Sequence, residues 1–421
     1  MSILVFDPAY SRYMIKLGKR LAKLKKTSCE AVLSSNAYRV YCYDLKCHVY
    51  YSRIQWKGEP KTDNLTSSDI VWGKDVVSKY RASYFGWLKA VFKGQHPELC
   101  IFHNEKFLLC TLAIELCEEY QIPYVVLERG AFRPFTTTCD LQGTNANARF
   151  RQIEHDPKIQ IEPLKKQYRL DFKRSAEKAI YTRFGFFLLI ITFENFLFPG
   201  KRYLQHKKFS ILEYARVSLG FLNKKVFPSF SSKSSEEKKL PKKYVFVPLQ
   251  RPGDTQLTFS NDFPGMQEFI DLVVESVRKV MPEVDIVFKQ HPYDIDAYDF
   301  HGCIELHHKS SLSLIKNSSV VLNYNSTVGF ESLVENIPVV CLGESFYTKG
   351  EYVYKPFSMT VDAVSSAINK AMLYGSKVSG DSVMANVLVH YQVSGSMYRY
   401  DSLDIDMCAA KILNICGNPS R

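Results

Sequence analysis

Short apolar runs alternate with amphipathic segments along the first part of the chain. The runs have the length and the β-branched or aromatic content of buried strands, and they lie at Ile3–Phe6, Ala31–Leu33, Arg39–Tyr43, Leu99–His103 and Tyr124–Glu128. Between them, apolar residues recur at helical spacing, at residues 10–26, 75–92 and 107–120. This alternation predicts a doubly wound, Rossmann-like domain built on a parallel sheet.

The same alternation returns in the second half of the chain. Strands are expected at Tyr244–Leu249, Val284–Lys289, Cys303–Leu306, Val320–Tyr324 and Pro338–Leu342, and helices at 264–280, 310–317, 326–335, 361–375 and 403–415. The stretch before them is helical and basic, and it ends in Ser229–Lys243, which has the composition of a linker. The sequence therefore predicts the α/β class, with Rossmann-like, doubly wound domains at 1–154 and 244–400, a helical connector at 155–243 and a terminal helix at 401–421.

Polar residues with useful chemistry follow four of the predicted strands. They are Glu128, Gln250 with Asp254, His291, and the run that begins at Asn325. Because ligands bind outside the carboxyl ends of parallel strands, we expect these side chains to share a cleft. For any single strand, a capping or turn residue explains the pattern equally well. Four such strands together favour an enzyme.

Two carboxylates and a histidine are the candidate catalytic groups. Asp254 lies on a tight Pro-Gly turn, where a carboxylate can act as a nucleophile or stabilise a cationic transition state. Glu128 ends an otherwise uncharged strand beside Arg129, an environment that suits acid–base chemistry. His291 begins a His-Pro dipeptide and could donate to a phosphate or to a leaving-group oxygen. Each of the three could also be an ordinary turn residue.

The remaining candidates would bind substrate. Ser326 and Thr327 open a predicted helix whose N–H groups and hydroxyls make an anion site, although plain N-capping would look the same. Cations near the catalytic candidates would hold a carboxylate or a phosphate, and a polar loop would bind sugar hydroxyls. The candidates are Arg129, Arg133, Gln250, Arg251, Lys289, Pro292, Asn325, Ser326 and Thr327, with Thr138, Asp140 and Asn145 in the polar loop.

Charge and cysteine content narrow the range of partners. The chain has 55 Lys and Arg against 43 Asp and Glu, a net charge of +12, which suits nucleic acid, an anionic membrane surface or an acidic sugar nucleotide. Nucleic-acid binding would rest on this charge alone, because no stacking motif is present. Eleven cysteines without a CxxC pair indicate reduced thiols in a cytosolic protein, and no secretory leader precedes the first strand.

An apolar block interrupts the predicted connector at Phe184–Phe198. The block is shorter than the ~20 apolar residues that a spanning helix needs. Lys201, Arg202, Lys207 and Lys208 follow it closely. An interfacial helix on an anionic cytoplasmic leaflet has this pattern, and so does a helix buried between two domains. The sequence supports both interpretations equally, and the first predicts peripheral membrane attachment.

Several of these segments together resemble one protein family. They are Leu-Glu-Arg-Gly-Ala-Phe-Arg-Pro at 127–134, the threonine-rich run at 136–147, Val-Pro-Leu-Gln-Arg-Pro-Gly-Asp-Thr-Gln at 247–256, Phe-Lys-Gln-His-Pro at 288–292, Asn-Tyr-Asn-Ser-Thr-Val-Gly at 323–329 and Leu-Gly-Glu-Ser-Phe-Tyr at 342–347. In this order they are similar to the motifs of the capsule polysaccharide biosynthesis and export proteins, which are retaining β-Kdo glycosyltransferases of Gram-negative capsule systems.

The resemblance implies a GT-B fold, in which an acceptor-side domain and a nucleotide-sugar domain face a central cleft. It implies CMP-β-Kdo as the donor, no cofactor or metal, and transfer with retention to a lipid, glycolipid or saccharide acceptor. Asp254 falls at the position of the family's catalytic aspartate, Glu128 at its motif glutamate and His291 at its His-Pro histidine. The implied location is the cytoplasmic face of the inner membrane. Other capsule assembly proteins are possible partners there, and no nucleic-acid partner is expected.

Two other functions are compatible with the same sequence. An enzyme of this fold could use another CMP-nonulosonic acid or a nucleotide-activated polyol phosphate as donor. A non-catalytic component of capsule assembly or export could keep the fold for binding alone. The presence of Glu128, Asp254 and His291 together argues against the second alternative.

Overall fold

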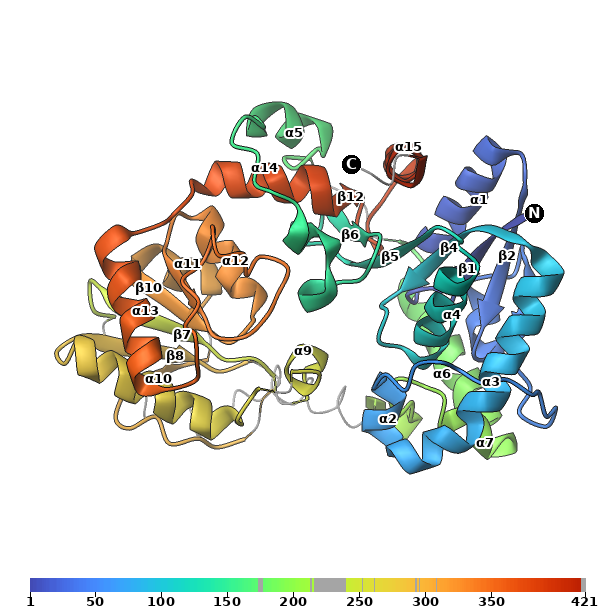
Figure 1. The fold of residues 1–421 in the computed structure, drawn as a ribbon, viewed down its shortest axis with the longest axis horizontal. Helices are drawn as coiled ribbons and strands as arrows, with labels where there is room; N and C mark the ends of the chain where they lie inside the picture. The colour runs from blue at the N-terminus through green and yellow to red at the C-terminus, as the bar shows by residue number, and fades with distance from the viewer. Residues whose placement is uncertain are drawn as a thin grey trace. The chain divides into compact units, whose positions relative to one another are not determined.

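The computed structural model divides the chain into two compact units (Figure 1). It describes residues 1–172, 177–212, 214–215, 240–251, 253–260, 262–291, 294, 296–307 and 309–417. Unit 1 comprises Met1–Thr144, Tyr168–Lys238 and Gln392–Arg421, and unit 2 comprises Asn145–Gln167 and Lys239–Tyr391. Each unit is built on its own largely parallel sheet flanked by helices, which confirms the predicted α/β class.

Unit 1 contains a seven-stranded sheet in the order β12-β6-β5-β4-β1-β2-β3. The strands are β1 (Ser2–Phe6), β2 (Ser28–Leu33), β3 (Lys46–Val49), β4 (Pro97–His103), β5 (Tyr124–Arg129), β6 (Thr136–Asp140) and β12 (Gln392–Ser394). β1 to β5 pair in parallel, whereas β6 is antiparallel to both of its neighbours. The parallel strands are hydrophobic on both faces, as a sheet covered by helices on each side requires.

Helices cover both faces of the sheet of unit 1. Ile3 and Val5 pack on one side with α1 (Tyr13–Lys25), α6 (Ile180–Leu197) and α15 (Ser402–Gly417). Leu4 and Phe6 pack on the other side with α3 (Lys74–Gln95) and α4 (Leu108–Glu119). Each of these four strand side chains is fully buried, which stabilises the fold by about 1.5–3 kcal/mol per residue.

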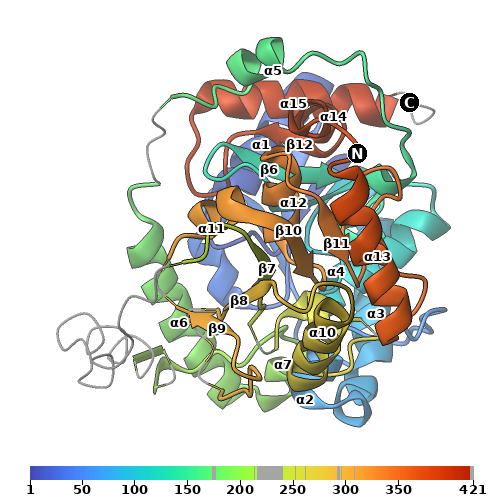
Figure 2. The same ribbon diagram turned by 90° about the vertical axis from the view of Figure 1, so that its left-hand side faces the viewer.

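Unit 2 contains a five-stranded parallel sheet in the order β11-β10-β7-β8-β9. The strands are β7 (Tyr244–Pro248), β8 (Asp285–Lys289), β9 (Ile304–Leu306), β10 (Ser318–Asn323) and β11 (Val339–Cys341). α10 (Met266–Val280) and α13 (Val361–Tyr374) pack side by side on one face (Figure 2). The other helices are α9 (Thr255–Thr258), α11 (Ser311–Asn317), α12 (Thr327–Val334), α14 (Gly380–Tyr391) and α5 (Ile161–Gln167).

Each sheet has a switch point, where successive strands stop adding to one side of the sheet and start adding to the other. In unit 1 the chain adds β2 and β3 on one side of β1, and then β4 and β5 on its other side. In unit 2 it adds β8 and β9 on one side of β7, and then β10 and β11 on the other. The crevice outside the strand ends at such a point is the usual ligand site of an open α/β sheet, so ligands are expected at β1/β4 and at β7/β10.

Most predicted strands and helices are present, and two predicted segments are wrong. Arg39–Tyr43 is not a strand, because Asn36–Val40 forms a 3-10 helix (η1) that Ser35 caps and α6 covers. Thr136–Asp140 is not a polar loop but the buried strand β6, since its β-branched threonines pair with both β5 and β12. The predicted connector at 155–243 is divided, with residues up to Gln167 in unit 2 and those from Tyr168 to Lys238 in unit 1.

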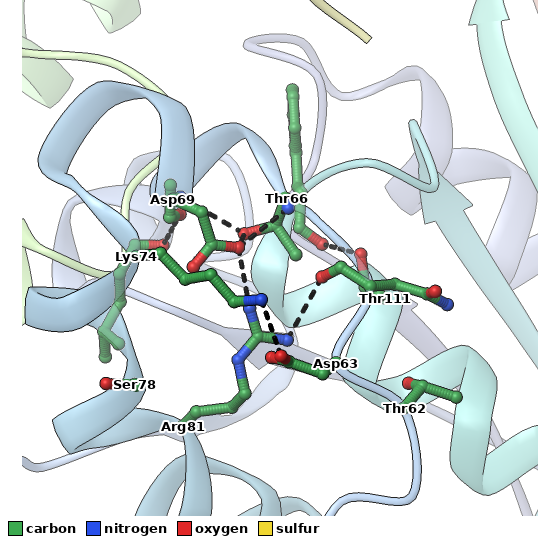
Figure 3. Close-up of polar contacts among 12 residues, drawn as sticks. Thr62, Asp63, Thr66, Asp69, Lys74, Ser78, Arg81 and Thr111 are labelled. Atoms are coloured by element: carbon green, nitrogen blue, oxygen red, sulfur yellow. Dashed lines mark hydrogen bonds and ion pairs between the residues drawn. The ribbon is translucent and has the colours of Figure 1, made fainter. Parts of the chain in front are cut away.

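A buried ion pair fixes the segment that leads into α3. Asp69 of α2 (Ser67–Trp72) accepts hydrogen bonds from Thr66 N at 2.8 Å and from Arg81 Nη2 at 2.6 Å (Figure 3). Arg81 also donates to the carbonyl of Asn64 at 3.3 Å, and Ser67 N donates to Lys106 O at 2.8 Å. Through these contacts the segment before α2 is tied to the loop that follows β4.

We expect Arg81→Met to lower the free energy of unfolding by about 3–5 kcal/mol, because it leaves the Asp69 carboxylate buried without its cation. Asp69 and Arg81 are 4% and 5% exposed, and Asp69 Oδ1 already has no partner among the described residues. Urea denaturation measures the change. The matched control is Lys74→Ala, which breaks the exposed Lys74–Asp63 pair and should leave stability unchanged. An equal effect of the two substitutions would contradict the prediction.

Candidate functional site

The switch point of unit 2 brings together two of the predicted residues. Gln250 follows β7 and Asn325 follows β10, and Gln250 Nε2 donates to Asn325 Oδ1 at 2.8 Å. Asn325 N is 3.4 Å from Gln250 Oε1, and Asn325 Nδ2 donates to Gln256 O at 3.2 Å. Both amide side chains are buried. The pair therefore bridges the crevice between β7 and β10 and anchors the turn that carries Asp254.

Asp254 lies at the start of α9 and is half-buried. Its Oδ1 accepts a hydrogen bond from Gln256 N at 2.9 Å, and its carbonyl accepts one from Thr258 N at 2.9 Å. Gly253 before it has φ +73°, a conformation that favours glycine. The carboxylate is thus held in one place by a tight turn, and it also caps a short helix.

His291 at the end of β8 lies within electrostatic range of Asp254. Burial and the positive charge of Arg251 lower the pKa of His291 below its ordinary value of 6.5, while Asp254 and Asp294 act in the opposite direction. Lys289 Nζ donates to Ser311 Oγ at 2.9 Å, and burial lowers the pKa of Lys289. An imidazole that is neutral at physiological pH can donate one hydrogen bond without adding charge. Pro292 lies outside the described residues.

The run after β10 begins α12 as predicted. Ser326 is its N-cap and accepts from Val328 N at 3.3 Å, whereas Thr327 is exposed. Tyr347 OH donates to Asn323 Oδ1 at 2.9 Å and also to the carbonyl of Ser326. A side chain at Gly329 would begin 2.5 Å from both Asn323 and Tyr347, so only glycine lets α12 approach this closely. Val328 N and Gly329 N both donate to Ser326, which caps the helix, and α12 begins directly after β10, so its N-terminus lies at the end of the strand where an anion could bind.

A hollow of ≈ 520 Å³ lies beside the Asp254 turn, within unit 2. Its size is that of a small-molecule site. It is lined by Gly253, Leu257, Thr258, Ser260, Phe263, Met266, Gln267, Asp296 and Tyr298.

Asp294 and Asp296 have Asp-x-Asp spacing, a metal-binding pattern that the prediction of a metal-free reaction overlooked. Asp296 lines this hollow. Asp294 Oδ1 accepts from Asp296 N at 3.1 Å, and its Oδ2 accepts from Tyr298 OH at 3.2 Å. Within the described part of the chain, no group of three or more His, Cys, Asp or Glu side chains is arranged to hold a metal ion.

The predicted residues Glu128, Arg129, Arg133, Thr138 and Asp140 belong to unit 1, whereas Asn145 belongs to unit 2. Glu128 near the end of β5 is half-buried, and Asn104 Nδ2 lies 3.5 Å from its Oε1. Arg129 is exposed and lies over the ring of Tyr398 at 5.4 Å. Arg133 is also exposed, and its Nε donates to Gly130 O at 3.3 Å.

The three residues of the predicted polar loop have different surroundings. Thr138 and Asp140 are buried in β6, where Thr138 donates to Arg129 O at 3.2 Å and Asp140 Oδ1 accepts from Gln142 N at 2.8 Å. Asn145 belongs to unit 2, and its N–H donates to Tyr391 OH at 2.9 Å. Thr138 and Asp140 therefore use hydrogen-bonding groups inside the fold.

The family described as capsule polysaccharide biosynthesis protein matches residues 111–350, which contain all of the predicted site residues. The chain belongs to this family. The capsule polysaccharide modification protein LipB of Neisseria meningitidis serogroup B is 24% identical over 258 residues, which are 56% of this chain and 61% of LipB. The capsule polysaccharide export protein KpsS of Escherichia coli is 24% identical over 287 residues, 62% of this chain and 71% of KpsS. The chain thus spans less than two thirds of the length of LipB.

Two solved structures of Thermosulfurimonas dismutans KpsC are also similar to the chain. The β-Kdo 2,4 transferase is 12% identical with a TM-score of 0.44, and it covers 97% of this chain and 98% of its own. The β-Kdo 2,7 transferase is 16% identical with a TM-score of 0.41, covering 99% of both chains.

We expect the imidazole of His291 in this capsule family protein to titrate below pH 6.5, and its neighbours to shift it in opposite directions. Arg251→Ala should raise the pKa of His291, since the guanidinium disfavours a second positive charge, whereas Asp254→Asn should lower it. NMR of protein labelled with ¹³C at the histidine Cε1 measures the midpoints. Unchanged midpoints in both variants would show that the three side chains are not neighbours.

Proposed function

We propose that the chain is a retaining glycosyltransferase that moves Kdo from CMP-β-Kdo to a lipid-linked or saccharide acceptor in capsule polysaccharide biosynthesis. The observation that carries the proposal is that Arg251 and Asp254, after β7, both lie within electrostatic range of His291, after β8, in unit 2. This group combines a fixed carboxylate, a neutral imidazole and a guanidinium, and it lies within the segment that matches the capsule family.

The cationic and N–H-rich side of this group suits the donor phosphate. Arg251, the N-terminus of α12 and Lys289 would hold the phosphate and the carboxylate of CMP-Kdo. His291 would donate a hydrogen bond to the phosphate oxygen as the bond to the anomeric carbon breaks. This division of roles requires no metal ion, and we therefore propose a reaction without one.

Retention follows from two successive displacements. Asp254 would attack the anomeric carbon of Kdo as CMP leaves, which gives a glycosyl ester on the enzyme. The acceptor hydroxyl would then displace Asp254 from the same carbon and lose its proton to a general base. Each step inverts the anomeric centre once, so the product keeps the configuration of the donor.

CMP should be released from CMP-Kdo in the presence of EDTA, and not from UDP-sugars. The reason is that arginine, lysine and backbone N–H groups neutralise the leaving phosphate. A panel of CMP- and UDP-sugars and CDP-polyols, with detection of free nucleotide, makes the measurement. Activity that EDTA abolishes and manganese restores would refute the metal-free route and implicate Asp294 and Asp296. Release from a different donor would favour the alternative specificity, and no release at all would favour a binding component.

Asp254→Ala in the same assay should reduce release by roughly a thousandfold or more, while CMP still binds in calorimetry. Asp362→Ala, which removes an exposed carboxylate of the same unit, is the control and should keep full activity. Wild-type protein incubated with donor alone should gain the mass of one Kdo on the peptide that contains Asp254. An adduct on another carboxylate would reassign the nucleophile.

We further propose that the outer face of α6 attaches the protein to an anionic membrane surface. The inner face of α6 packs in unit 1 through Phe187, Leu188 and Ile191. The opposite face is apolar and exposed along the whole helix, at Tyr181, Phe186, Leu189, Ile190, Phe193, Phe196 and Leu197. Within the described residues this is the one helix long and apolar enough to cross a membrane, a property that core helices of soluble proteins share.

Charge beside the helix agrees with this location. Lys201 is buried, but Arg202 is exposed, and Lys207 and Lys208 follow close by in the chain. A contiguous apolar face flanked by cations has the chemistry of an interfacial helix at an anionic leaflet. The inner face of the apolar block at Phe184–Phe198 is buried within unit 1, and the proposal of lipid contact concerns the outer face alone.

The double substitution Phe193→Ser and Phe196→Ser should weaken sedimentation with phosphatidylserine-containing liposomes at low salt. These rings are 64% and 82% exposed, so their removal takes apolar area from the lipid contact without opening the core. The control is Phe357→Ser, which removes a ring that is 89% exposed in unit 2. Equal sedimentation of all three proteins would show that α6 does not bind lipid.

A further inference from the structure

Two cysteines meet at the edge of the sheet of unit 1. Cys47 lies in β3, the last strand on that side of the sheet, and Cys42 lies between η1 and β3. Both are free thiols. Their separation along the chain does not match the CxxC spacing of a redox motif, so nothing in the sequence pairs them. We call Cys42 and Cys47 the thiol pair.

A tight turn folds Cys47 back onto Cys42. Leu45 N donates to Cys42 O at 3.0 Å, which closes a four-residue turn. Cys47 Sγ donates to the same carbonyl at 3.6 Å and to Leu45 O at 3.4 Å. On its other side Cys47 pairs with Ala31 of β2, which fixes the start of β3. The turn thus places the sulfur of Cys47 against the residue that carries the second thiol.

The two thiols differ in their access to solvent. Cys42 is fully buried, whereas Cys47 is partly exposed. In the described part of the chain, β3 pairs only with β2 and leaves its other edge open. A small reagent in solution therefore reaches Cys47 first, and Cys42 reacts only through Cys47.

The surroundings of Cys47 favour its thiolate. A hydrogen bond from Cys42 lowers the pKa of Cys47 to about 7; the positive charge of Arg39 acts in the same direction, and burial and the charge of Asp44 oppose it. The same hydrogen bond, together with burial, raises the pKa of Cys42. Because the thiolate is the nucleophile in thiol–disulfide exchange, Cys47 has the properties of the attacking thiol and Cys42 those of the resolving thiol.

Cys29 of β2 shows that partial exposure alone does not produce this reactivity. It is also partly exposed, but burial of its thiol raises its pKa to about 12, although the charge of Lys19 opposes the shift. Cys29 therefore stays protonated near neutral pH, and it is a matched control for Cys47 on the neighbouring strand.

We propose that the thiol pair is a site of reversible oxidation, at which a low-molecular-weight disulfide such as glutathione disulfide converts Cys42 and Cys47 into an intramolecular disulfide. An accessible thiolate beside a resolving cysteine is the arrangement of a redox-sensing site. The inference goes beyond the glycosyl transfer proposed above and does not depend on it.

The oxidation takes two exchange steps. Cys47 Sγ attacks one sulfur of glutathione disulfide, the bond between the two glutathione sulfurs breaks, and one glutathione leaves as its thiolate. Cys42 then loses its proton and attacks Cys47 Sγ, which releases the second glutathione. Two cysteine thiols are oxidised, one disulfide is reduced to two thiols, and the two cysteine protons pass to the two glutathione molecules.

The new bond would tie the edge strand to a turn that contacts two helices. Asp44 in this turn forms an ion pair with Lys19 of α1 at 2.8 Å. Tyr41, directly before Cys42, packs against Phe187 of α6. Oxidation would therefore act where η1, β3 and these two helices meet.

The test uses the full-length protein, reduced and then incubated with glutathione disulfide at about pH 8, where most of Cys47 is thiolate. After the remaining thiols are alkylated, trypsin cuts after Lys46 and leaves the two cysteines in separate peptides, Val40–Lys46 and Cys47–Arg53. Mass spectrometry should find these peptides joined by a disulfide that dithiothreitol breaks. The rate of the first step should rise with pH, with a midpoint near about 7.

Three variants separate the two roles within the thiol pair. Cys42→Ser should accumulate glutathione on Cys47, because no thiol is left to resolve the mixed disulfide. Cys47→Ser should lose the cross-link and carry no glutathione on Cys42, which is buried. Cys29→Ser is the control and should form the cross-link at the rate of wild type.

Three results would overturn the proposal: Cys47 unmodified while other cysteines react, Cys47 joined to Cys29, or a midpoint near the ordinary cysteine value of about 8.5. Urea denaturation of each variant identifies a folding defect before the assay. The wild-type cross-link and its pH midpoint require no substitution, so they decide the matter even if a variant fails to fold.

Discussion

Parallel pairing of β1 with both β2 and β4 is the constraint on which the rest of unit 1 depends. Two parallel strands cannot be joined by a tight turn, so the chain must cross back over the sheet before each new strand. The crossings place the carboxyl ends of β1 to β5 at the same edge. Residues far apart in sequence then become neighbours without any attraction between them. In unit 2 the same constraint brings Gln250 and Asn325, 75 positions apart, to a 2.8 Å hydrogen bond.

Helix α6 shows how a buried ion pair can set the orientation of an apolar helix. A helix that is apolar all round has no hydrophobic preference for which side faces the core. Glu194 and Lys201 form an ion pair that is almost fully removed from solvent, and Glu194 is bonded to Asn36 as well. Rotation of the helix would move Glu194 away and leave the ammonium of Lys201 buried without its partner, which costs several kcal/mol. The ion pair thus decides which aromatic side chains are left outside.

Sequence patterns located the long strands and the polar residues after them, because both depend on local composition. They did not locate β3 and β12, which are short and partly polar and exist because neighbouring strands offer them hydrogen bonds. They misassigned 39–43, where the aromatic residues Tyr38 and Tyr41 pack on Phe187 of α6 instead of forming a strand. The division of the connector could not be read either, because it depends on α5 packing against α14.

The residues of the candidate site also differ in whether local composition could identify them. Glu128, Gln250 and Asp254 were visible as charged or amide residues that interrupt apolar patterns. Asp7 was not among the predicted site residues, because nothing local indicates that its carboxyl is buried or that β1 lies at a switch point. Burial and strand order are properties of the whole unit. The residues they affect most are those that a local pattern is least able to identify.

The position of β12 has a consequence for how the chain is made. β12 completes the sheet of unit 1 beside β6, and Gln392 Nε2 donates to Thr138 Oγ1 across 254 positions of sequence. Both stretches of unit 2 therefore lie between β6 and β12 in the chain, as two insertions within unit 1. During synthesis, β6 emerges from the ribosome with one edge unpaired and keeps it so while the whole of unit 2 is translated. Such an edge can pair with other strands, and closing so long a loop is slow. Biogenesis of this protein thus includes an interval in which the half-finished first sheet must be kept from pairing with other strands.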